Sequence, residues 1–246
     1  MSDVNQETDP FLVAAKHGHT ETVRILLQSG ASLNRNLDAA LVLSAEHGHT
    51  ETVRLLLKHK ANVHARTEWY AMPDAALQQA AQHGHTETVR VLLEAAADVH
   101  SPSFYDGCSD FALRCATQLG HIETVRVLLE HKADVHASDG SDAQDAALRW
   151  AATSGNIDMV RLLIEHKADV HARAYEESPD QILSLSIQFG HVTVAELLLS
   201  QGGIDSAQFV PSDFVTSYLC VSGHRVIVDN VARCMRLAQR PNCILH

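Results

Sequence analysis

Histidine is the residue type in this chain with the widest capacity for chemistry. The 246 residues include 17 histidines, and three identical His-Gly-His triplets stand at 17–19, 47–49 and 83–85. Paired imidazoles can bind zinc or transfer protons near neutral pH. A zinc site needs about four ligands and further groups that orient them. The triplets therefore raise the hypothesis of a solenoid that binds a metal or a small molecule through rows of histidines.

The triplets recur because each one opens a longer repeat. The phrase His-Gly-His-Thr-Glu-Thr-Val-Arg-x-Leu-Leu occurs three times with only the x position changed. Its glycine recurs seven times in related or degenerate copies, at positions 18, 48, 84, 120, 155, 190 and 223. A period of 30 to 36 residues over nearly the whole chain indicates a stack of supersecondary units. Recurrence in register favours a structural role for the histidine after each glycine over a metal site.

Each copy predicts two short helices on either side of its glycine. Before the glycine comes an alanine-rich segment such as 75–81, whose small residues can form one inward face. After it, Val23, Leu26 and Leu27 have the spacing of a buried helical stripe, and later copies repeat this spacing. The sequence therefore predicts stacked helix–turn–helix units, each joined to the next by a finger of variable length.

Capping residues are expected at the start of both helices. A carboxylate before a helix can accept its first free N–H groups and oppose its dipole. We expect this role for Asp9, which precedes Pro10, and for the aspartate ten residues before each later glycine: Asp38, Asp74, Asp110, Asp145, Asp180 and Asp213. Thr20, Thr50 and Thr86 can cap the second helices in the same way.

The repeated residues resemble one known family. Gly-His-x-Glu-x-Val-Arg-x-Leu-Leu, followed by Ala-Asp-Val, is similar to the ankyrin repeat and covers about residues 8–238. The phrases Asp-Ala-Ala-Leu-Arg-Trp-Ala and Asp-Val-His-Ala are similar to the long ankyrin arrays of giant DNA viruses and some protists. The resemblance implies an all-α ankyrin-repeat solenoid of about seven helix–turn–helix units with projecting fingers. We expect one domain over 1–246, with units at about 8–36, 37–72, 73–108, 109–143, 144–178, 179–211 and a capping unit at 212–240, and a tail at 241–246.

The chain departs from the family pattern in two places. The family's Thr-Pro-Leu-His stretch is replaced, for example by Ala75-Ala76-Leu77-Gln78, so the preceding aspartate must supply the cap. The glycine that usually ends the second helix is replaced by Lys60, Ala96, Lys132 and Lys167. If these four residues are left-handed, each costs on the order of 1 kcal/mol relative to glycine.

The resemblance also places a binding surface. It puts the two residues before each glycine on a concave groove, and these residues vary along the array, although an ordinary solvated surface would vary too. The fingers carry aromatic residues, which are typical interface anchors but could instead pack finger against finger. We expect Trp150 to pack between repeats. The predicted protein-binding residues are Trp69, Tyr70, Gln82, His83, Phe104, Tyr105, Gln118, Leu119, Thr153 and Ser154; Tyr175 is a further finger aromatic.

Composition narrows the classes of function. A formal net charge of −11 argues against nucleic acid as a partner. Five cysteines without a CxxC pattern read as free thiols in a reducing, cytoplasmic setting. The polar N-terminus is not that of a signal peptide, and no apolar run is long enough to span a membrane. The last four residues, from Cys243 to His246, have the outline of a prenylation box, but histidine is not a favoured final residue.

Catalytic signatures are missing from the sequence. It has no glycine-rich phosphate loop, no HExxH motif and no evident nucleophile–base pair. We therefore expect a monomer that is not an enzyme, has no cofactor or metal, and binds a protein partner through its groove and fingers.

Overall fold

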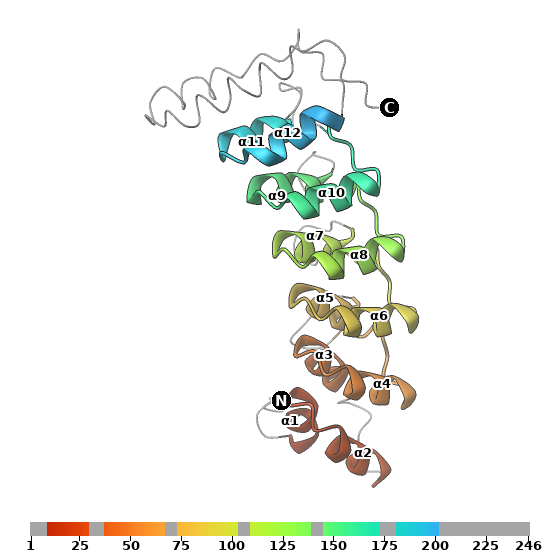
Figure 1. Cartoon of the computed structure of the whole chain (residues 1–246). Helices are drawn as coiled ribbons and strands as arrows, with labels where there is room; N and C mark the ends of the chain where they lie inside the picture. The colour runs from red at the N-terminus through yellow and green to blue at the C-terminus, as the bar shows by residue number, and fades with distance from the viewer. Residues whose placement is uncertain are drawn as a thin grey trace, which may run out of the picture. The chain divides into compact units, whose positions relative to one another are not determined.

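The computed structural model describes residues 9–29, 37–66, 73–102, 109–138, 145–172 and 181–201. Within these ranges the regular structure is entirely helical, as the sequence predicts (Figure 1). The helices are α1 (Pro10–Lys16), α2 (Thr20–Gln28), α3 (Leu37–Glu46), α4 (Thr50–Lys58), α5 (Ala75–Gln82), α6 (Thr86–Glu94), α7 (Phe111–Gln118), α8 (Ile122–Glu130), α9 (Ala146–Ser154), α10 (Ile157–Glu165), α11 (Gln181–Gln188) and α12 (Val192–Gln201). The degenerate copy at Gly223 lies outside the described residues.

The chain divides into two compact units, residues 1–134 and 135–246. The first unit contains the four helix pairs from α1 to α8, and the second contains the two pairs from α9 to α12. In the first unit α1, α3, α5 and α7 pack side by side in that order, and α2, α4, α6 and α8 form a parallel series. In the second unit α9 packs against α11, and α10 against α12. Each unit is thus a stack in which a helix pair contacts its neighbours.

The core lies between the helix layers and consists of small and aliphatic side chains. All residues of α5 from Ala75 to Ala81 are buried, because this helix is enclosed by α3, α6 and α7. Its alanines permit close packing, while Leu77 and, on α6, Leu92 fill the interior. The alanine segments and the Val-x-x-Leu-Leu stripes therefore form the interior that their spacing predicts, although in α2 Val23 is buried but Leu26 and Leu27 are only partly buried.

The turn glycines are required by conformation and by space. Gly84 has φ +71°, a left-handed value that other residues adopt at a cost. A Cβ built on Gly84 would come within 2.6 Å of Nδ1 of His121, from the next repeat. His121 in turn donates a hydrogen bond from Nε2 to the carbonyl of Gln82, 3.0 Å away. The histidine after the turn glycine is therefore structural, as the repeat predicts, and it joins neighbouring repeats.

The same contact recurs in both units. His49, His85 and His191 donate from Nε2 to the carbonyls of Lys16, Glu46 and Thr153, each over 2.9 Å. The rings of these histidines lie against Gly18, Gly48 and Gly155.

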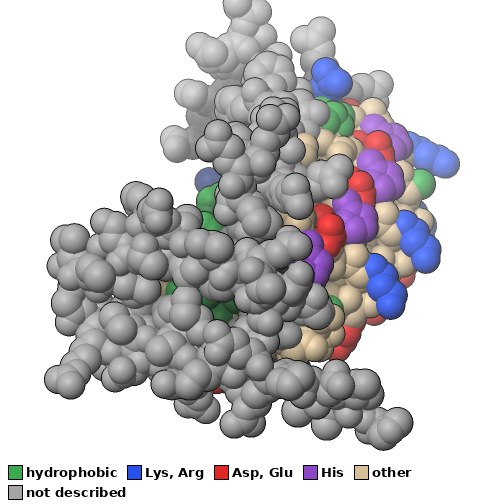
Figure 2. All heavy atoms as spheres, turned by 90° about the horizontal axis from the view of Figure 1, so that it is seen from above, with side chains coloured by type: hydrophobic (Ala, Val, Ile, Leu, Met, Phe, Trp, Pro, Cys, Tyr) green, Lys and Arg blue, Asp and Glu red, His purple; other side chains and the backbone are tan. Residues whose placement is uncertain are grey.

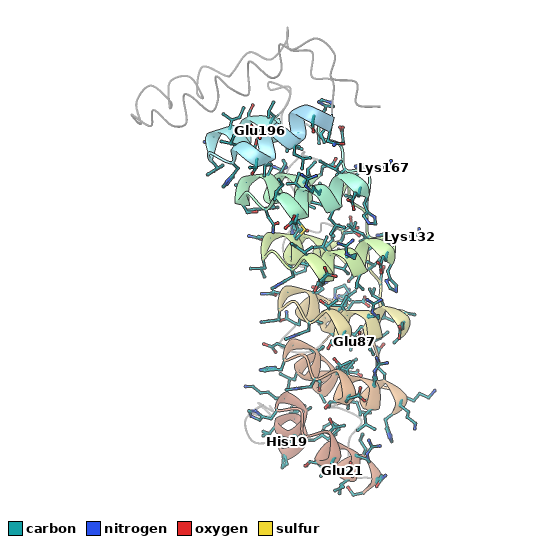
Figure 3. The ribbon with its side chains drawn as sticks, in the orientation of Figure 1. His19, Glu21, Glu87, Lys132, Lys167 and Glu196 are labelled. Carbon is teal, nitrogen blue, oxygen red and sulfur yellow. The ribbon has the colours of Figure 1, made fainter. Side chains whose placement is uncertain are left out.

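The second helices end in left-handed residues, which confirms the expectation for four non-glycine positions. Their φ values are 72° at Lys60, 67° at Ala96, 72° at Lys132 and 74° at Lys167. Figure 3 labels Lys132 and Lys167 where α8 and α10 end. The left-handed residue turns the chain from the second helix toward the base of the next finger.

Among the described residues, the prediction that aspartates cap the first helices is correct for Asp9, which accepts from Phe11 N at 2.9 Å, and Asp180 and Asp213 lie outside the described residues. Asp74, Asp110 and Asp145 occupy the cap positions but are left-handed, with φ of 51° to 55°, and their side chains accept nothing from the helix. Each carboxylate instead accepts from a backbone N–H 24 residues later, in Asp98, Asp134 and Asp169 respectively, over 2.8–3.0 Å. Asp38 makes the same bond to Asn62 N from within α3.

The expected threonine caps are also wrong. The N-caps of α2, α4 and α6 are His19, His49 and His85, none of which makes a side-chain cap bond. Each threonine is one residue inside its helix, and its hydroxyl hydrogen-bonds a threonine of the next repeat instead. The pairs are Thr20 with Thr52 (2.8 Å), Thr50 with Thr88 (2.8 Å) and Thr86 with Thr124 (2.9 Å).

Candidate functional site

One line of exposed side chains crosses the first unit at the ends of its first helices. We call it the turn row and define it as the residue immediately before each turn glycine: His17, His47, His83 and Leu119. All four are exposed, and they follow α1, α3, α5 and α7, which pack side by side in this order. The repeat thus presents three imidazoles and one aliphatic side chain along one edge of the unit.

Two of the turn-row imidazoles are fixed by their own helices. His47 donates from Nδ1 to the carbonyl of Leu43, and His83 donates from Nδ1 to the carbonyl of Gln79, both over 3.0 Å. Carbonyl oxygens only accept, so these bonds assign the proton to Nδ1 in the neutral rings. Neither bond engages Nε2, which is the ring nitrogen that a ligand could meet.

Each histidine of the turn row lies beside a second imidazole, that of the histidine after the turn glycine. The rings of His47 and His49 are stacked with centroids 6.2 Å apart, and those of His83 and His85 with centroids 6.1 Å apart. Burial lowers the pKa of His85, and the neighbouring imidazoles of His83, His47 and His49 lower it further, against the raising effect of its bond to the Glu46 carbonyl. The pKa of His85 therefore responds to the charge of the three neighbouring imidazoles.

The geometry gives no support to the metal-binding alternative. Among the residues that the structure describes, no group of three or more histidine, cysteine, aspartate or glutamate side chains is arranged to hold a metal ion. The second histidine of each stacked pair, His49 or His85, already uses Nε2 to bond a carbonyl of the preceding repeat.

The predicted groove residues divide between the two units. Gln82, His83, Gln118 and Leu119 lie at the ends of the neighbouring helices α5 and α7. Gln82 is partly buried, whereas the other three are exposed.

Thr153 and Ser154 occupy the corresponding place at the end of α9, in the second unit. Their hydroxyls donate to the carbonyls of Arg149 (2.8 Å) and Ala151 (3.1 Å) within the same helix. Each hydroxyl proton is therefore engaged by the helix that carries it.

The predicted finger aromatics Trp69, Tyr70, Phe104, Tyr105 and Tyr175 lie outside the described residues, but the bases of three fingers are described. A histidine at the start of each finger donates from Nδ1 to the buried aspartate at its end. The distances are 2.9 Å for His64–Asp74, 3.1 Å for His100–Asp110 and 3.0 Å for His136–Asp145. Sequence reasoning missed these pairs, although the recurring Val-His segment, 9 or 10 residues before the aspartate, was a signal for them.

The aspartates of these pairs are buried, and burial raises the pKa of both Asp110 and Asp145. The hydrogen bonds from the backbone of Asp134 or Asp169 and from the finger histidine oppose this rise. Asp98 and His100, which lie at the start of the second of these fingers, are both exposed. Figure 2 shows that histidine and acidic side chains alternate on one part of the surface.

Gln78 connects the bases of two fingers. It is fully buried, and its Nε2 donates to the carbonyls of Pro73 (3.1 Å) and Pro102 (3.3 Å). Ser101 adds a bond from Oγ to the Pro73 carbonyl at 2.9 Å. Pro73 closes the finger that contains Trp69, and Pro102 opens the finger that contains Phe104, so Gln78 ties the two bases together.

Four large apolar side chains are exposed among the described residues: Ile25, Leu119, Trp150 and Phe189. Trp150, expected to pack between repeats, is 37% exposed and lies at the surface of α9. Phe189 directly precedes a turn glycine, as Leu119 does in the first unit, and is 52% exposed. The family resemblance places this position on the groove, but Phe189 is not among the predicted binding residues.

Comparison with protein families agrees with this architecture. A family model described as ankyrin repeats, in three copies, matches residues 1–67, 70–139 and 139–209. A search of curated proteins found no match. Within the described residues, no helix has the length and apolar character needed to cross a membrane.

Proposed function

Because the chain belongs to the ankyrin-repeat family, whose repeats generally mediate protein–protein interaction, we propose that it is a non-catalytic module that binds a protein partner. The surface that we propose comprises the variable residues before the turn glycines and the finger aromatics. On the first unit it includes Gln82, His83, Gln118 and Leu119.

The observation that carries this proposal is the contrast between repeated and variable positions. The repeated glycine, the histidine after it and the aspartate before the first helix are engaged in contacts within or between repeats. The residues just before the glycine differ from repeat to repeat, and the last of them is exposed in every described repeat. Recognition of a specific partner needs surface residues that can vary without loss of the fold, and these positions meet that need.

We propose that the fingers supply aromatic anchors on a defined base. The His–Asp pairs close the fingers, and Gln78 links the fingers that carry Trp69, Tyr70, Phe104 and Tyr105. A fixed base lowers the entropy that an anchor loses when it binds, so it favours affinity. On the second unit, Thr153 and Ser154 are the corresponding candidate positions at the turn.

The net charge of the chain and the repetition of the His–Asp pairs support two further parts of the proposal, which are the type of partner and the absence of catalysis. The net charge of −11 favours a protein partner over nucleic acid, and we propose a monomer without cofactor. The His–Asp pairs recur at successive fingers, which fits a structural part of the repeat better than a single catalytic centre.

The experiment that tests this function is affinity capture followed by direct binding. Proteins from native cytosol are captured on the wild-type chain and on a variant with Gln82→Ala, Gln118→Ala and Leu119→Ala. A control variant carries Glu51→Ala, Glu87→Ala and Glu123→Ala, on the exposed faces of α4, α6 and α8. We expect a protein that the wild type and the control retain and the first variant loses, and that binds the purified chain directly. Retention by both variants would contradict the proposed surface.

A further inference from the structure

We propose that the turn row binds an extended acidic peptide segment, with carboxylates at every third residue, and binds it more tightly as the imidazoles become protonated. The inference rests on the proposed protein-binding function and specifies the partner's chemistry and its regulation by pH. It concerns only the first unit, where His17, His47, His83 and Leu119 follow four neighbouring helices.

The spacing of the row sets the register of the peptide. Packed helices lie about 8–10 Å apart, so successive members of the row are separated by about that distance. A peptide in the extended polyproline II conformation advances about 3.1 Å per residue and has three residues per turn, so every third side chain lies on the same side and three residues span one step of the row. The matching segment has the pattern Glu-x-x-Glu-x-x-Glu-x-x-Leu, in which three carboxylates meet the three histidines and the leucine meets Leu119.

Hydrogen bonding prepares the imidazoles for a carboxylate. In His47 and His83 the Nδ1–H is already donated to a helix carbonyl, so a proton gained by the ring is placed on Nε2. An Nε2–H of a charged imidazole donates a charge-assisted bond to a carboxylate. His17 and His83 are also the C-cap residues of α1 and α5, where the helix dipole favours a positive charge.

The fixed charges directly beside the row cancel, so protonation of its histidines gives it a positive charge. Of the residues that precede the row histidines, Lys16 is positive, Gln82 is neutral and Glu46 is negative. The rings of His19, His49 and His85 lie beside those of the row histidines, with centroids 6.1–6.2 Å apart. His121 donates to the Gln82 carbonyl. The nearby glutamates at the starts of the second helices face arginines of those helices at 3.1–3.7 Å: Glu21 with Arg24, Glu51 with Arg54, Glu87 with Arg90 and Glu123 with Arg126.

The cluster also explains why binding depends on pH. Histidine imidazoles change charge between about pH 5 and pH 8, and a carboxylate beside an imidazole favours its charged form. Carboxylates from a partner therefore favour protonation of the row, so binding is accompanied by proton uptake and strengthens as the pH falls. A polyphosphate is a poorer ligand for the row, because its continuous negative charge is repelled by the glutamates of the second helices and by the net charge of −11. A short peptide can carry its carboxylates only where they meet the row.

The test uses labelled peptides and the full chain. One peptide has the pattern above, a second has the same pattern in reverse order, and a third has the same composition with its glutamates contiguous. Binding is measured at about pH 6 and about pH 7.5, with circular dichroism at both values to verify the fold. We expect at least one spaced peptide to bind about 30-fold more tightly at the lower pH, because net uptake of one proton changes affinity tenfold per pH unit. We also expect it to bind more tightly than the contiguous peptide.

Matched histidine variants assign the effect to the row. The double variant His47→Gln/His83→Gln removes two row imidazoles. The control His59→Gln/His131→Gln removes two C-cap imidazoles from the ends of α4 and α8, and His131 makes the same kind of bond, from Nδ1 to the Val127 carbonyl. We expect the first variant, which keeps only His17 in the row, to lose most of the pH dependence and the control to keep it. Equal pH dependence in both variants, or no preference for a spaced peptide, would overturn the inference.

The outcomes also separate this inference from the proposed function. A partner that requires Gln118 and Leu119 but binds independently of pH and of His47 and His83 would overturn the acidic-peptide inference and leave the proposed function standing. The opposite result is also possible: a spaced peptide binds with pH dependence, but no captured protein requires Gln82, Gln118 and Leu119. That result would support the row and contradict the proposed function. Tighter binding of a single-stranded oligonucleotide than of any peptide would overturn the inference in favour of a nucleic-acid ligand.

Discussion

Asp110 illustrates how one buried residue takes part in two contacts. Its carboxylate accepts from Asp134 N at 2.8 Å and from Nδ1 of His100 at 3.1 Å. Asp74 in the first unit and Asp145 in the second unit make the same two contacts. At the scale of the residue, these aspartates join the finger to the backbone segment that follows the second helix.

Replacing Asp110 should reveal this role. Asp110→Ala leaves the Asp134 N–H without its acceptor, and we expect a loss of about 1–3 kcal/mol in the free energy of unfolding. Asp110→Asn keeps an acceptor and removes a buried charge, so we expect a smaller loss. Urea denaturation of both variants measures the difference. Equal losses in the two variants would mean that the backbone bond contributes little.

The pKa of His85 predicts how stability depends on pH. The folded-state pKa lies below the unfolded value of about 6.5, so the unfolded chain binds more protons in this range. The contribution of His85 is therefore present above pH 6.5 and is lost as the pH falls toward the folded-state pKa. We expect the denaturation midpoint of His85→Gln to fall less than that of the wild type between about pH 7.5 and pH 5.5. Parallel losses in the two proteins would contradict this assignment.

The helices and their order could be predicted from the sequence because their signals are local. The alanine segment at 75–81 and the Val-x-x-Leu-Leu stripe repeat in register, and the observed helix α5 extends only one residue beyond that segment. The roles of Asp110 and Thr86 could not be read in this way, because their partners are 24 and 38 residues away. An aspartate before a helix is expected to cap it, and the sequence does not show that the backbone of Asp110 is left-handed.

The ends of the second helices give a prediction at the scale of the element. Lys60, Lys132 and Lys167 are left-handed, a conformation in which glycine is not strained. We expect Lys→Gly at each position to stabilise the protein by a few tenths to about 1 kcal/mol, as measured by thermal or urea denaturation. As a matched control, Lys58→Gly inside the last turn of α4 should destabilise by about 0.5–1 kcal/mol. If all three substitutions lower the melting temperature, side-chain contacts of the lysines outweigh backbone strain.

The candidate site was less predictable from the sequence than the fold. The family resemblance identified the positions before the turn glycines; of these, His83, Gln118 and Leu119 are exposed, and Gln82 is partly buried. It gave no sign that Gln78 connects two fingers, since that contact depends on a side chain that departs from the family pattern.

The finger aromatics give a prediction at the scale of the whole molecule. We expect Trp69→Ala and Tyr105→Ala each to weaken a captured partner about 30-fold or more, since truncating an interface hot spot costs about 2 kcal/mol or more. The melting temperatures should stay close to that of the wild type. Calorimetric titration of the purified partner and a thermal melt of each variant provide both quantities. Normal binding by both variants, or unfolding of both, would show that the fingers are packing elements.

The central claim is that a protein partner binds at the variable residues of the first unit, and a matched pair of variants tests it most directly. Leu119 is 54% exposed on the turn row, and Ile25 is 58% exposed on α2, so each offers a similar aliphatic surface to solvent. The measurement is the affinity of the captured partner for Leu119→Ala and for Ile25→Ala. We predict a loss of about 30-fold for Leu119→Ala and a change within about twofold for Ile25→Ala. Equal losses, or a greater loss for Ile25→Ala, would contradict the claim.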